Sequence, residues 1–234
     1  QDWALLAGLL EPGAGVDPEG FDRIFVTYDS GRSLPEVPEG IPVHRVRTPL
    51  GGGPFSRSEA EYDLEMLRRL GYRGALPPLY AGWSPPDPDP WPAAGQRVVV
   101  APCGRREGRW SGKRWPGWVE LIERLVAPGD RHVVVLGGPE EADVQVPDLP
   151  GVSREIGTRS LDQAAGILRT SHAAAGNDCG MAHLADALQV PHVVVFGPTD
   201  EVKNGPLHTG TILTPAGDGR PSQVWHGVLE GATR

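Results

Sequence analysis

Three short runs of branched apolar residues dominate the second half of the chain: Arg97–Ala101 (RVVVA), His132–Leu136 (HVVVL) and His192–Phe196 (HVVVF). Each run is continuously apolar rather than alternating, which is typical of strands buried on both faces of a parallel sheet. Segments with helical spacing separate the runs. The pattern predicts a doubly wound α/β domain with helices on both faces of the sheet and right-handed crossovers.

Other segments of this half continue the alternation. The sequence predicts helices over Trp118–Val126, Ser160–Arg169 and Gly180–Gln189, and strands over Ala173–Gly176 and Thr211–Thr214. In such sheets a ligand binds at the carboxyl ends of the strands, at the point where the strand order reverses. The residues that follow the predicted strands are therefore the candidates for a site.

A proline-rich segment separates this domain from the first part of the chain. Seven of the sixteen residues from Pro77 to Pro92 are proline, a density that excludes a helix or a central strand. A domain boundary is expected near residues 84–95, between residues 1–92 and residues 93–234. The first part holds predicted helices at 3–10 and 58–70 and predicted strands at 23–28 and 43–47.

Composition excludes several classes of protein. The net charge of −8 argues against a protein that coats nucleic acid or a membrane surface. The longest apolar run is shorter than the roughly 20 residues of a membrane-spanning helix, so no integral membrane segment is expected. Two cysteines, Cys103 and Cys179, are too few for a disulfide framework. The expected location is the cytoplasm, either free or peripheral at the inner membrane.

The first candidate binding segment is a basic stretch between a predicted strand and a predicted helix. It runs from Arg105 to Pro116 and carries five positive charges and one negative charge. Lys113 within it is one of only two lysines in the chain. A flexible basic loop there, which includes Arg109 and Arg114, is suited to binding a diphosphate together with the preceding residues Cys103 and Gly104. The alternative is an arginine-rich surface loop without a ligand.

The second candidate segment is Gly176–His183 (GNDCGMAH), a polar turn between a strand and a helix. The free N–H groups of residues 179–182, Met181 among them, form a potential anion site, and Gly180 allows close approach of a ligand. Asn177 and Cys179 belong to the same turn. Asp178 is either a ligand contact or the N-cap of the helix. His183 either reaches the ligand or lies in the core, bonded to a backbone carbonyl.

Two further turns follow predicted strands. Gly138, Glu140 and Glu141 form one of them, and a carboxylate at this position often binds ribose hydroxyls. Alternatively these acids favour the start of the next helix, and the sequence does not decide between Glu140 and Glu141. The other turn, Phe196–Asp200 (FGPTD), is either a ligand contact or a plain loop.

Taken in order, these segments resemble glycosyltransferase family 9, the ADP-heptose:lipopolysaccharide heptosyltransferases and their relatives. The resemblance rests on K-x-W-P at Lys113, LGGPEE at Leu136, Ser160-Leu161, GNDCGMAHLADAL at Gly176, and VPHVVVFGPT at Val190. It covers roughly residues 97–206. Residues 58–71 also resemble a helix of that family.

The resemblance implies a GT-B fold, with a small or incomplete acceptor-side domain at residues 1–92 and a donor-binding domain at 93–234. It implies an inverting, metal-independent transfer of a heptose or related sugar, with no cofactor. The donor would be a nucleotide sugar, with ADP-sugar favoured over GDP- or UDP-sugar. The acceptor would be a glycan, a lipid-linked glycan, a protein or a small molecule. Lys113 and Asp178 would act in catalysis, and His183 would line the sugar–diphosphate site.

Three departures from the family pattern bear on activity. The family usually opens with a Gly-Asp turn that supplies a general base, and no such turn precedes Trp3, so that base lies upstream of Gln1, is replaced or is not needed. Asp29 is the best substitute. Cys179 stands where the family carries Ser or Thr, and a thiol is the poorer donor. A long C-terminal helix is also missing after Gly219.

Two other functions and one pairing remain open at this stage. The chain could be a binding module without catalysis, or a sugar-nucleotide epimerase with the same fold. Independently of the family, Cys103 and Cys179 each follow a strand, and the two strands are expected to be neighbours at the reversal point. The two thiols are therefore expected to lie close together, with a disulfide or a metal pair as the less favoured outcome.

Overall fold

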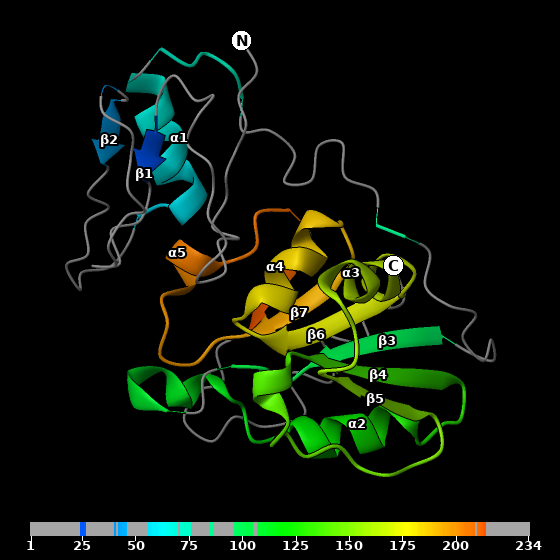
Figure 1. Cartoon of the computed structure of the whole chain (residues 1–234). Coiled ribbons are helices and arrows are strands. Elements are labelled where there is room, and N and C mark those ends of the chain that lie inside the picture. Colours follow the sequence, from blue (N-terminus) through cyan, green and yellow to red (C-terminus); the bar gives the residue numbers. More distant parts are fainter. Residues whose placement is uncertain are drawn as a thin grey trace. The chain divides into compact units, whose positions relative to one another are not determined.

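The computed structural model of the protein describes residues 24–26, 40, 42–45, 56–69, 71–75, 85–86, 96–104, 107–208 and 210–213. The predicted helix at 3–10, the candidate base Asp29 and most of the proline-rich segment lie outside these residues. The chain divides into two compact units, residues 1–53 with 60–73, and residues 54–59 with 74–234. Figure 1 shows the whole chain.

The first unit contains a parallel strand pair. Strands β1 (Ile24–Val26) and β2 (Val43–Arg45) pair in parallel with Ile24 opposite Val43, at the positions that the sequence predicts. Helix α1 (Glu59–Arg69) follows and ends before Gly71, whose positive φ of 102° favours glycine. A parallel pair followed by a helix belongs to the α/β class.

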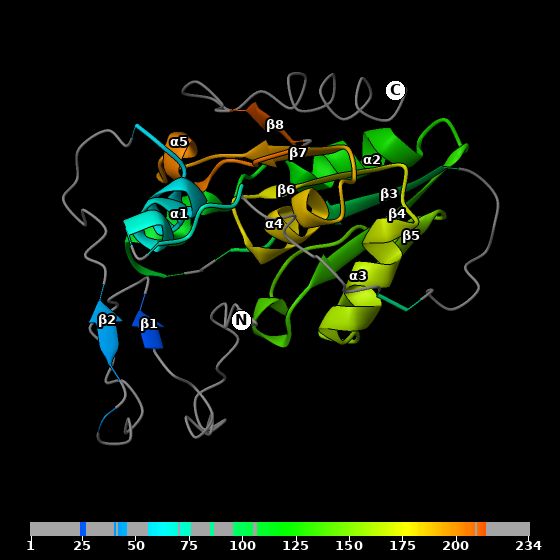
Figure 2. The ribbon, with the colours of Figure 1, turned by 90° about the horizontal axis from the view of Figure 1, so that it is seen from above.

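The second unit is built on a six-stranded parallel sheet in the order β5-β4-β3-β6-β7-β8 (Figure 2). Its strands are β3 (Gln96–Ala101), β4 (Arg131–Gly137), β5 (Val152–Ile156), β6 (Ala173–Asn177), β7 (His192–Val195) and β8 (Gly210–Leu213). Counted from β3, this is the 3-2-1-4-5-6 order of dinucleotide-binding domains. The strand order reverses between β3 and β6, which pair with Ala101 opposite Gly176. The predicted α/β class with a parallel sheet is confirmed.

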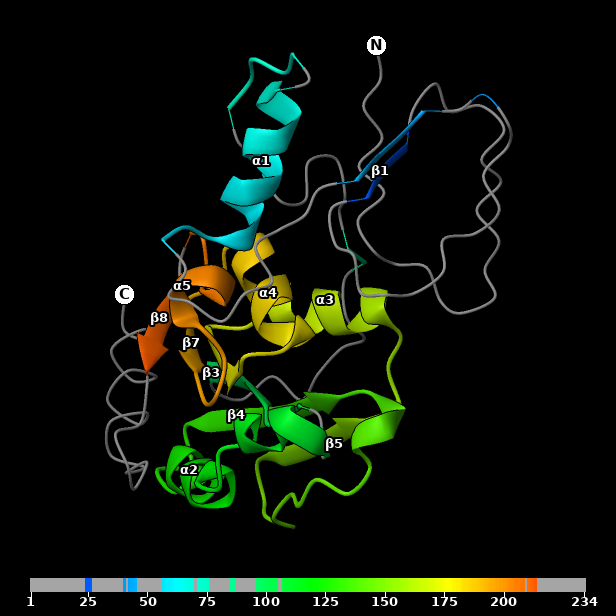
Figure 3. The same ribbon diagram turned by 90° about the vertical axis from the view of Figure 1, so that its left-hand side faces the viewer.

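Helices cover both faces of this sheet, as Figure 3 shows, with α2 (Trp118–Val126) on one face and α3 (Leu161–Arg169) and α4 (Gly180–Ala187) on the other. Alternate residues of each strand face opposite layers. Val98 and Val100 pack with α2, whereas Val99 packs with α3 and α4. Because both layers are apolar, the strands read as continuous valine runs. A short helix, α5 (Glu201–Asn204), leads into β8.

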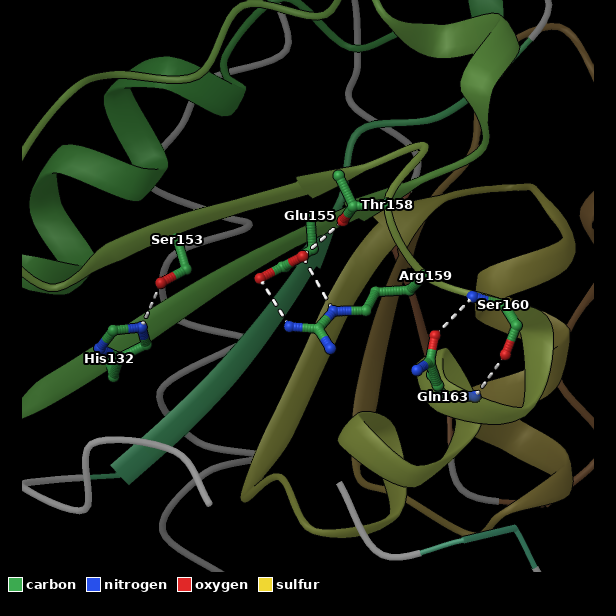
Figure 4. Close-up of polar contacts among 7 residues, drawn as sticks. All are labelled: His132, Ser153, Glu155, Thr158, Arg159, Ser160 and Gln163. Atoms are coloured by element: carbon green, nitrogen blue, oxygen red, sulfur yellow. Dashed lines mark hydrogen bonds and ion pairs between the residues drawn. The ribbon is translucent and has the colours of Figure 1, made fainter. Parts of the chain in front are cut away.

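Strand β5 was not predicted from the sequence, because three of its five residues are polar and it lies at the edge of the sheet. Polar contacts anchor it and the turn that follows (Figure 4). On β5, Glu155 accepts from Arg159 Nε at 2.9 Å and Nη2 at 3.0 Å. Ser160 and Gln163 then form the predicted capping box at the start of α3.

No helix among the described residues has the length and apolar character needed to cross a membrane.

Candidate anion site at the strand reversal

The turns that follow β3, β4, β6 and β7 lie at the same edge of the sheet, because all four strands are parallel. The predicted segments Cys103–Gly104, Gly138–Glu141, Asn177–Cys179 and Gly197–Thr199 occupy these turns. The fold therefore brings together segments that are far apart in the sequence. Their meeting point is the reversal between β3 and β6, where parallel α/β sheets bind ligands.

Lys113 and Asp178 form an ion pair at this point. Lys113 Nζ lies 2.8 Å from Asp178 Oδ2 and donates to the Asp178 backbone oxygen at 3.1 Å. The Asp178 side chain is 4% exposed, and that of Lys113 is 20% exposed. A nearly buried carboxylate thus holds the ammonium at the end of β6. The helix N-cap is Cys179, so the alternative prediction of Asp178 as N-cap is wrong.

The basic segment is more ordered than predicted. Residues Gly108–Lys113 form a 3-10 helix, η1, rather than a flexible loop. Its end packs against the turn after β7, where a Cβ on Gly197 would lie 2.4 Å from the Gly112 backbone oxygen and 3.2 Å from Lys113 Cα. Gly197 is therefore required for the close approach that positions Lys113. The sequence left this turn undecided between a ligand contact and a plain loop.

The N-terminus of α4 lies beside the ion pair. At Gly180, which is exposed, an added Cβ would meet no atom within 4 Å. Met181 is partly buried, and its side chain packs against the core. His183 is 54% exposed, with Nε2 3.7 Å from Asp178 Oδ1, so it does not lie in the core. An open helix N-terminus beside an ammonium and an imidazole favours an anion.

Asn177 stabilises the site through buried hydrogen bonds. Its side chain is fully buried, and its Oδ1 accepts from Trp115 N at 3.2 Å and from Trp118 Nε1 at 3.1 Å. Its Nδ2 donates to the Cys103 backbone oxygen at 2.8 Å. These three bonds join β6 to β3 and to the segment leading into α2. The Asn177 side chain thus forms hydrogen bonds within the protein, although the sequence predicts Asn177 as a ligand contact.

Glu141 connects two of the turns. Its Oε1 accepts from Gly104 N at 2.9 Å and its Oε2 from Gly138 N at 2.8 Å. The two carboxylate oxygens of Glu141 therefore hold the backbone of the turns that follow β3 and β4. Glu140 lies exposed in the same 3-10 turn, η2 (Pro139–Glu141). Of the two acids that the sequence could not separate, Glu140 presents its carboxylate to solvent and Glu141 is committed to the protein.

Arg114 is also committed to the protein. Its Nε donates to the Gly104 backbone oxygen at 2.7 Å, and its Nη1 pairs with Asp143 at 2.7 Å. The sequence did not single out Asp143, because no local pattern connects it to Arg114. Arg109 lies in η1, and its side chain is outside the described structure.

Cys103 and Cys179 meet as expected, and both are free thiols. Cys103 is buried, and its Sγ contacts the Leu136 backbone oxygen at 3.1 Å. The neighbouring Cys179 thiol, together with burial, raises the pKa of Cys103. The neighbouring Cys103 thiol, and then the N–H groups of Ala182 and Met181, lower the pKa of Cys179. No three metal-ligating side chains cluster among the described residues.

The 3-2-1-4-5-6 parallel sheet, with the candidate anion site at its reversal point, has the architecture of a Rossmann-type domain. The sequence model of glycosyltransferase family 9 (heptosyltransferase) matches residues 87–215, which include the whole of this site. The chain belongs to glycosyltransferase family 9.

Two curated relatives illustrate the similarity. Lipooligosaccharide heptosyltransferase 2 of Haemophilus influenzae is 27% identical over 148 residues, covering 58% of this chain and 42% of that protein. Lipopolysaccharide heptosyltransferase 1 of Escherichia coli is 33% identical over 92 residues, covering 38% of this chain and 29% of that protein. The chain therefore matches less than half the length of either relative.

Solved structures share the fold. A family 9 glycosyl transferase from Veillonella parvula has a TM-score of 0.57 at 16% identity, covering 83% of this chain and 64% of that one. ADP-heptose lipopolysaccharide heptosyltransferase II of Escherichia coli has a TM-score of 0.52 at 19% identity, covering 80% of this chain and 56% of that one.

Proposed function

We propose that residues 93–234 bind a nucleotide sugar, and that the protein transfers a heptose or related sugar from it to an acceptor hydroxyl. The observation that carries this proposal is the placement of Lys113 Nζ, 2.8 Å from Asp178 Oδ2 beside the open N-terminus of α4. The solved Escherichia coli heptosyltransferase WaaC is described with ADP. That precedent favours an ADP-sugar over a GDP- or UDP-sugar as the donor.

The chemical task of such a site is to stabilise a leaving group. A nucleoside diphosphate gains negative charge as the glycosidic bond breaks. The Lys113 ammonium and the N–H groups at the start of α4 converge on the place where this charge develops. Donors that are already oriented stabilise the transition state without reorganising during the reaction. Asp178 holds the ammonium in place and acts as a positioning residue.

The nucleoside end of the donor would lie toward the turn after β4. Glu140 is exposed there, and a carboxylate at this position of a Rossmann-type sheet accepts hydrogen bonds from ribose hydroxyls. His183, exposed one turn into α4, is placed to contact the sugar–diphosphate. The residues proposed to touch the donor are thus Lys113, Glu140, His183 and the backbone of residues 179–182.

The finer features of the reaction are proposals that follow the family resemblance. We expect inversion at the anomeric carbon without a metal, because the ammonium and the helix N-terminus supply the positive charge that a metal would otherwise provide. We propose that the acceptor is a hydroxyl group of a glycan, a lipid-linked glycan, a protein or a small molecule. The general base that activates this hydroxyl would be Asp29 or another carboxylate.

Calorimetry with ADP, GDP and UDP tests the donor site. Wild-type protein should bind ADP most tightly. The Lys113→Ala variant should bind on the order of tenfold to a hundredfold more weakly, since it removes a charged hydrogen-bond donor. Arg124→Ala is the matched control, because it also removes one positive charge but lies exposed on α2, paired with Glu120.

Equal losses in both variants would show that only long-range charge matters and would contradict a site at Lys113. Absence of binding to all three nucleotides would overturn the donor-site proposal. Product analysis with ADP-heptose and an acceptor extract then separates a transferase from a binding module. Release of ADP that depends on the acceptor supports transfer, and binding without release supports the module.

A further inference from the structure

The only two cysteines of the chain follow the two paired strands that meet at the candidate site. They are 76 positions apart in sequence (179 − 103), and the sheet order brings them together. Cys103 follows β3 and Cys179 follows β6, the two strands that pair with Ala101 opposite Gly176. The Asn177 side chain ties this arrangement by donating to the Cys103 backbone oxygen at 2.8 Å.

The spacing of the two strands suits a disulfide bond. Neighbouring strands lie about 4.8 Å apart, and a disulfide requires a Cα separation of about 4.4–6.8 Å. Each thiol shifts the pKa of the other, which agrees with the neighbouring positions that the strand pairing gives them. Both thiols are free in the structure.

The two thiols differ in their surroundings. Cys179 is the half-buried N-cap of α4, where the partial positive charge of a helix N-terminus stabilises a thiolate. Its pKa is lowered by the neighbouring Cys103 thiol and by the N–H groups of Ala182 and Met181. Cys103 is only 3% exposed, and its own pKa is raised by the neighbouring Cys179 thiol and by burial. Cys179 is therefore the thiol that an oxidant meets first.

We propose that Cys103 and Cys179 form a reversible intramolecular disulfide in the presence of a peroxide, and that this disulfide weakens anion binding at the start of α4. In the first step Cys179 Sγ attacks a peroxide oxygen, so that an S–O bond forms, the O–O bond breaks and water leaves after proton uptake. In the second step Cys103 Sγ attacks the Cys179 sulfenic sulfur, so that an S–S bond forms and a second water leaves. Two thiols lose two hydrogens, and one hydrogen peroxide becomes two waters.

The effect on binding rests on the proposed function. Cys179 directly follows Asp178 and directly precedes the open Gly180. Drawing Cys179 toward β3 moves the N-cap of α4 and the carboxylate that holds Lys113. We expect ADP affinity in the oxidised protein to fall on the order of tenfold, and to recover when a dithiol reductant is added.

Intact mass under non-reducing conditions tests the disulfide directly. Treatment of the wild-type chain with hydrogen peroxide should remove two hydrogens from the monomer and both titratable thiols together. In Cys103→Ser, Cys179 should stop at the sulfenic acid and be trapped by dimedone. In Cys179→Ser, Cys103 should oxidise on the order of tenfold more slowly, since it is buried and its thiolate is disfavoured.

The proposal is overturned if wild-type monomer gains oxygen without losing two hydrogens, if it forms only cross-linked dimers, or if Cys179→Ser oxidises as fast as wild type. Equal ADP affinity in the reduced and oxidised forms would overturn its effect on binding. If reduced protein binds no ADP at all, the donor-site function fails, and the disulfide is still judged by the mass measurement.

Discussion

The ammonium of Lys113 lies 2.8 Å from Oδ2 of Asp178, although the two residues are 65 positions apart, one at the end of η1 and the other after β6. Asp178 is nearly buried, and Lys113 also donates to its backbone oxygen. One residue therefore contacts the same ammonium twice, by an ion pair through its carboxylate and by a hydrogen bond through its backbone oxygen. The pair fixes a cation at the strand reversal, beside the N-terminus of α4. In the proposed function Lys113 binds the donor, and Asp178 holds Lys113 in position.

Asp178→Asn separates these two roles. The substitution removes a negative charge beside a bound diphosphate but keeps the shape of the side chain. ADP affinity should be equal to or higher than that of wild type, because like-charge repulsion is lost. Sugar transfer should be about tenfold to a hundredfold slower, because Lys113 loses its anchor. Calorimetry and steady-state kinetics check both arms. Weaker ADP binding with normal turnover would instead show that Asp178 touches the donor.

Asn177→Ala tests the support beneath the site. The change leaves the Trp118 indole N–H and the Cys103 backbone oxygen without their buried partner. Unfolding free energy in urea should fall by about 2–4 kcal/mol, since each unsatisfied buried group costs about 1–3 kcal/mol. Asn204→Ala is the control, because Asn204 is the only other asparagine and is not fully buried. Similar losses in both variants would contradict the role of Asn177.

Gly197→Ala tests the packing that positions Lys113. The new Cβ would lie 2.4 Å from the Gly112 backbone oxygen, so η1 must shift, at a cost of about 1–3 kcal/mol. Thermal unfolding should show reduced stability, and ADP affinity should fall with it. Gly180→Ala is the matched control for stability, because its Cβ meets open space and its stability should change by no more than about 1 kcal/mol. Unchanged stability and ADP affinity in Gly197→Ala would rule out the close approach.

Stability should depend on pH through His192, which is 4% exposed on β7. Burial lowers the pKa of His192 below its ordinary value of 6.5, against the opposing effects of the Val190 carbonyl and Asp186 and with a smaller lowering from His183. The unfolded chain therefore binds the proton more readily than the folded one. Unfolding free energy should fall as the pH drops below 6.5, and the decline should level off below the folded-state pKa.

Urea unfolding at several pH values measures this decline. His192→Gln should flatten it, although His132, whose pKa burial also lowers, leaves a residual slope. His172→Gln, at an exposed position, is the matched control and should leave the profile unchanged. A decline of equal size in wild type and His192→Gln would assign the effect to other groups.

The elements were largely predictable because their signals are local. The valine runs predicted β3, β4 and β7, and the spacing of apolar residues predicted α2 with the observed bounds, Trp118–Val126. The Ser160–Gln163 capping box predicted the start of α3. Strand β5 was missed, because this edge strand has three consecutive polar residues and gives no continuous apolar run. Helix η1 was missed because a glycine-containing basic segment carries no helical periodicity.

By itself, the sequence determined the class of fold, the segments that follow each predicted strand, and the neighbouring positions of Cys103 and Cys179 across the reversal. These depend on periodicity, caps and the general rule that parallel strands end at one edge. The tertiary structure alone decided which side chains serve the ligand and which serve the protein. Lys113 meets Asp178, Glu141 binds two backbone N–H groups, and Arg114 pairs with Asp143. Such contacts join turns distant in sequence, so they depend on strand order and on the packing of η1 against Gly197, which no local pattern encodes.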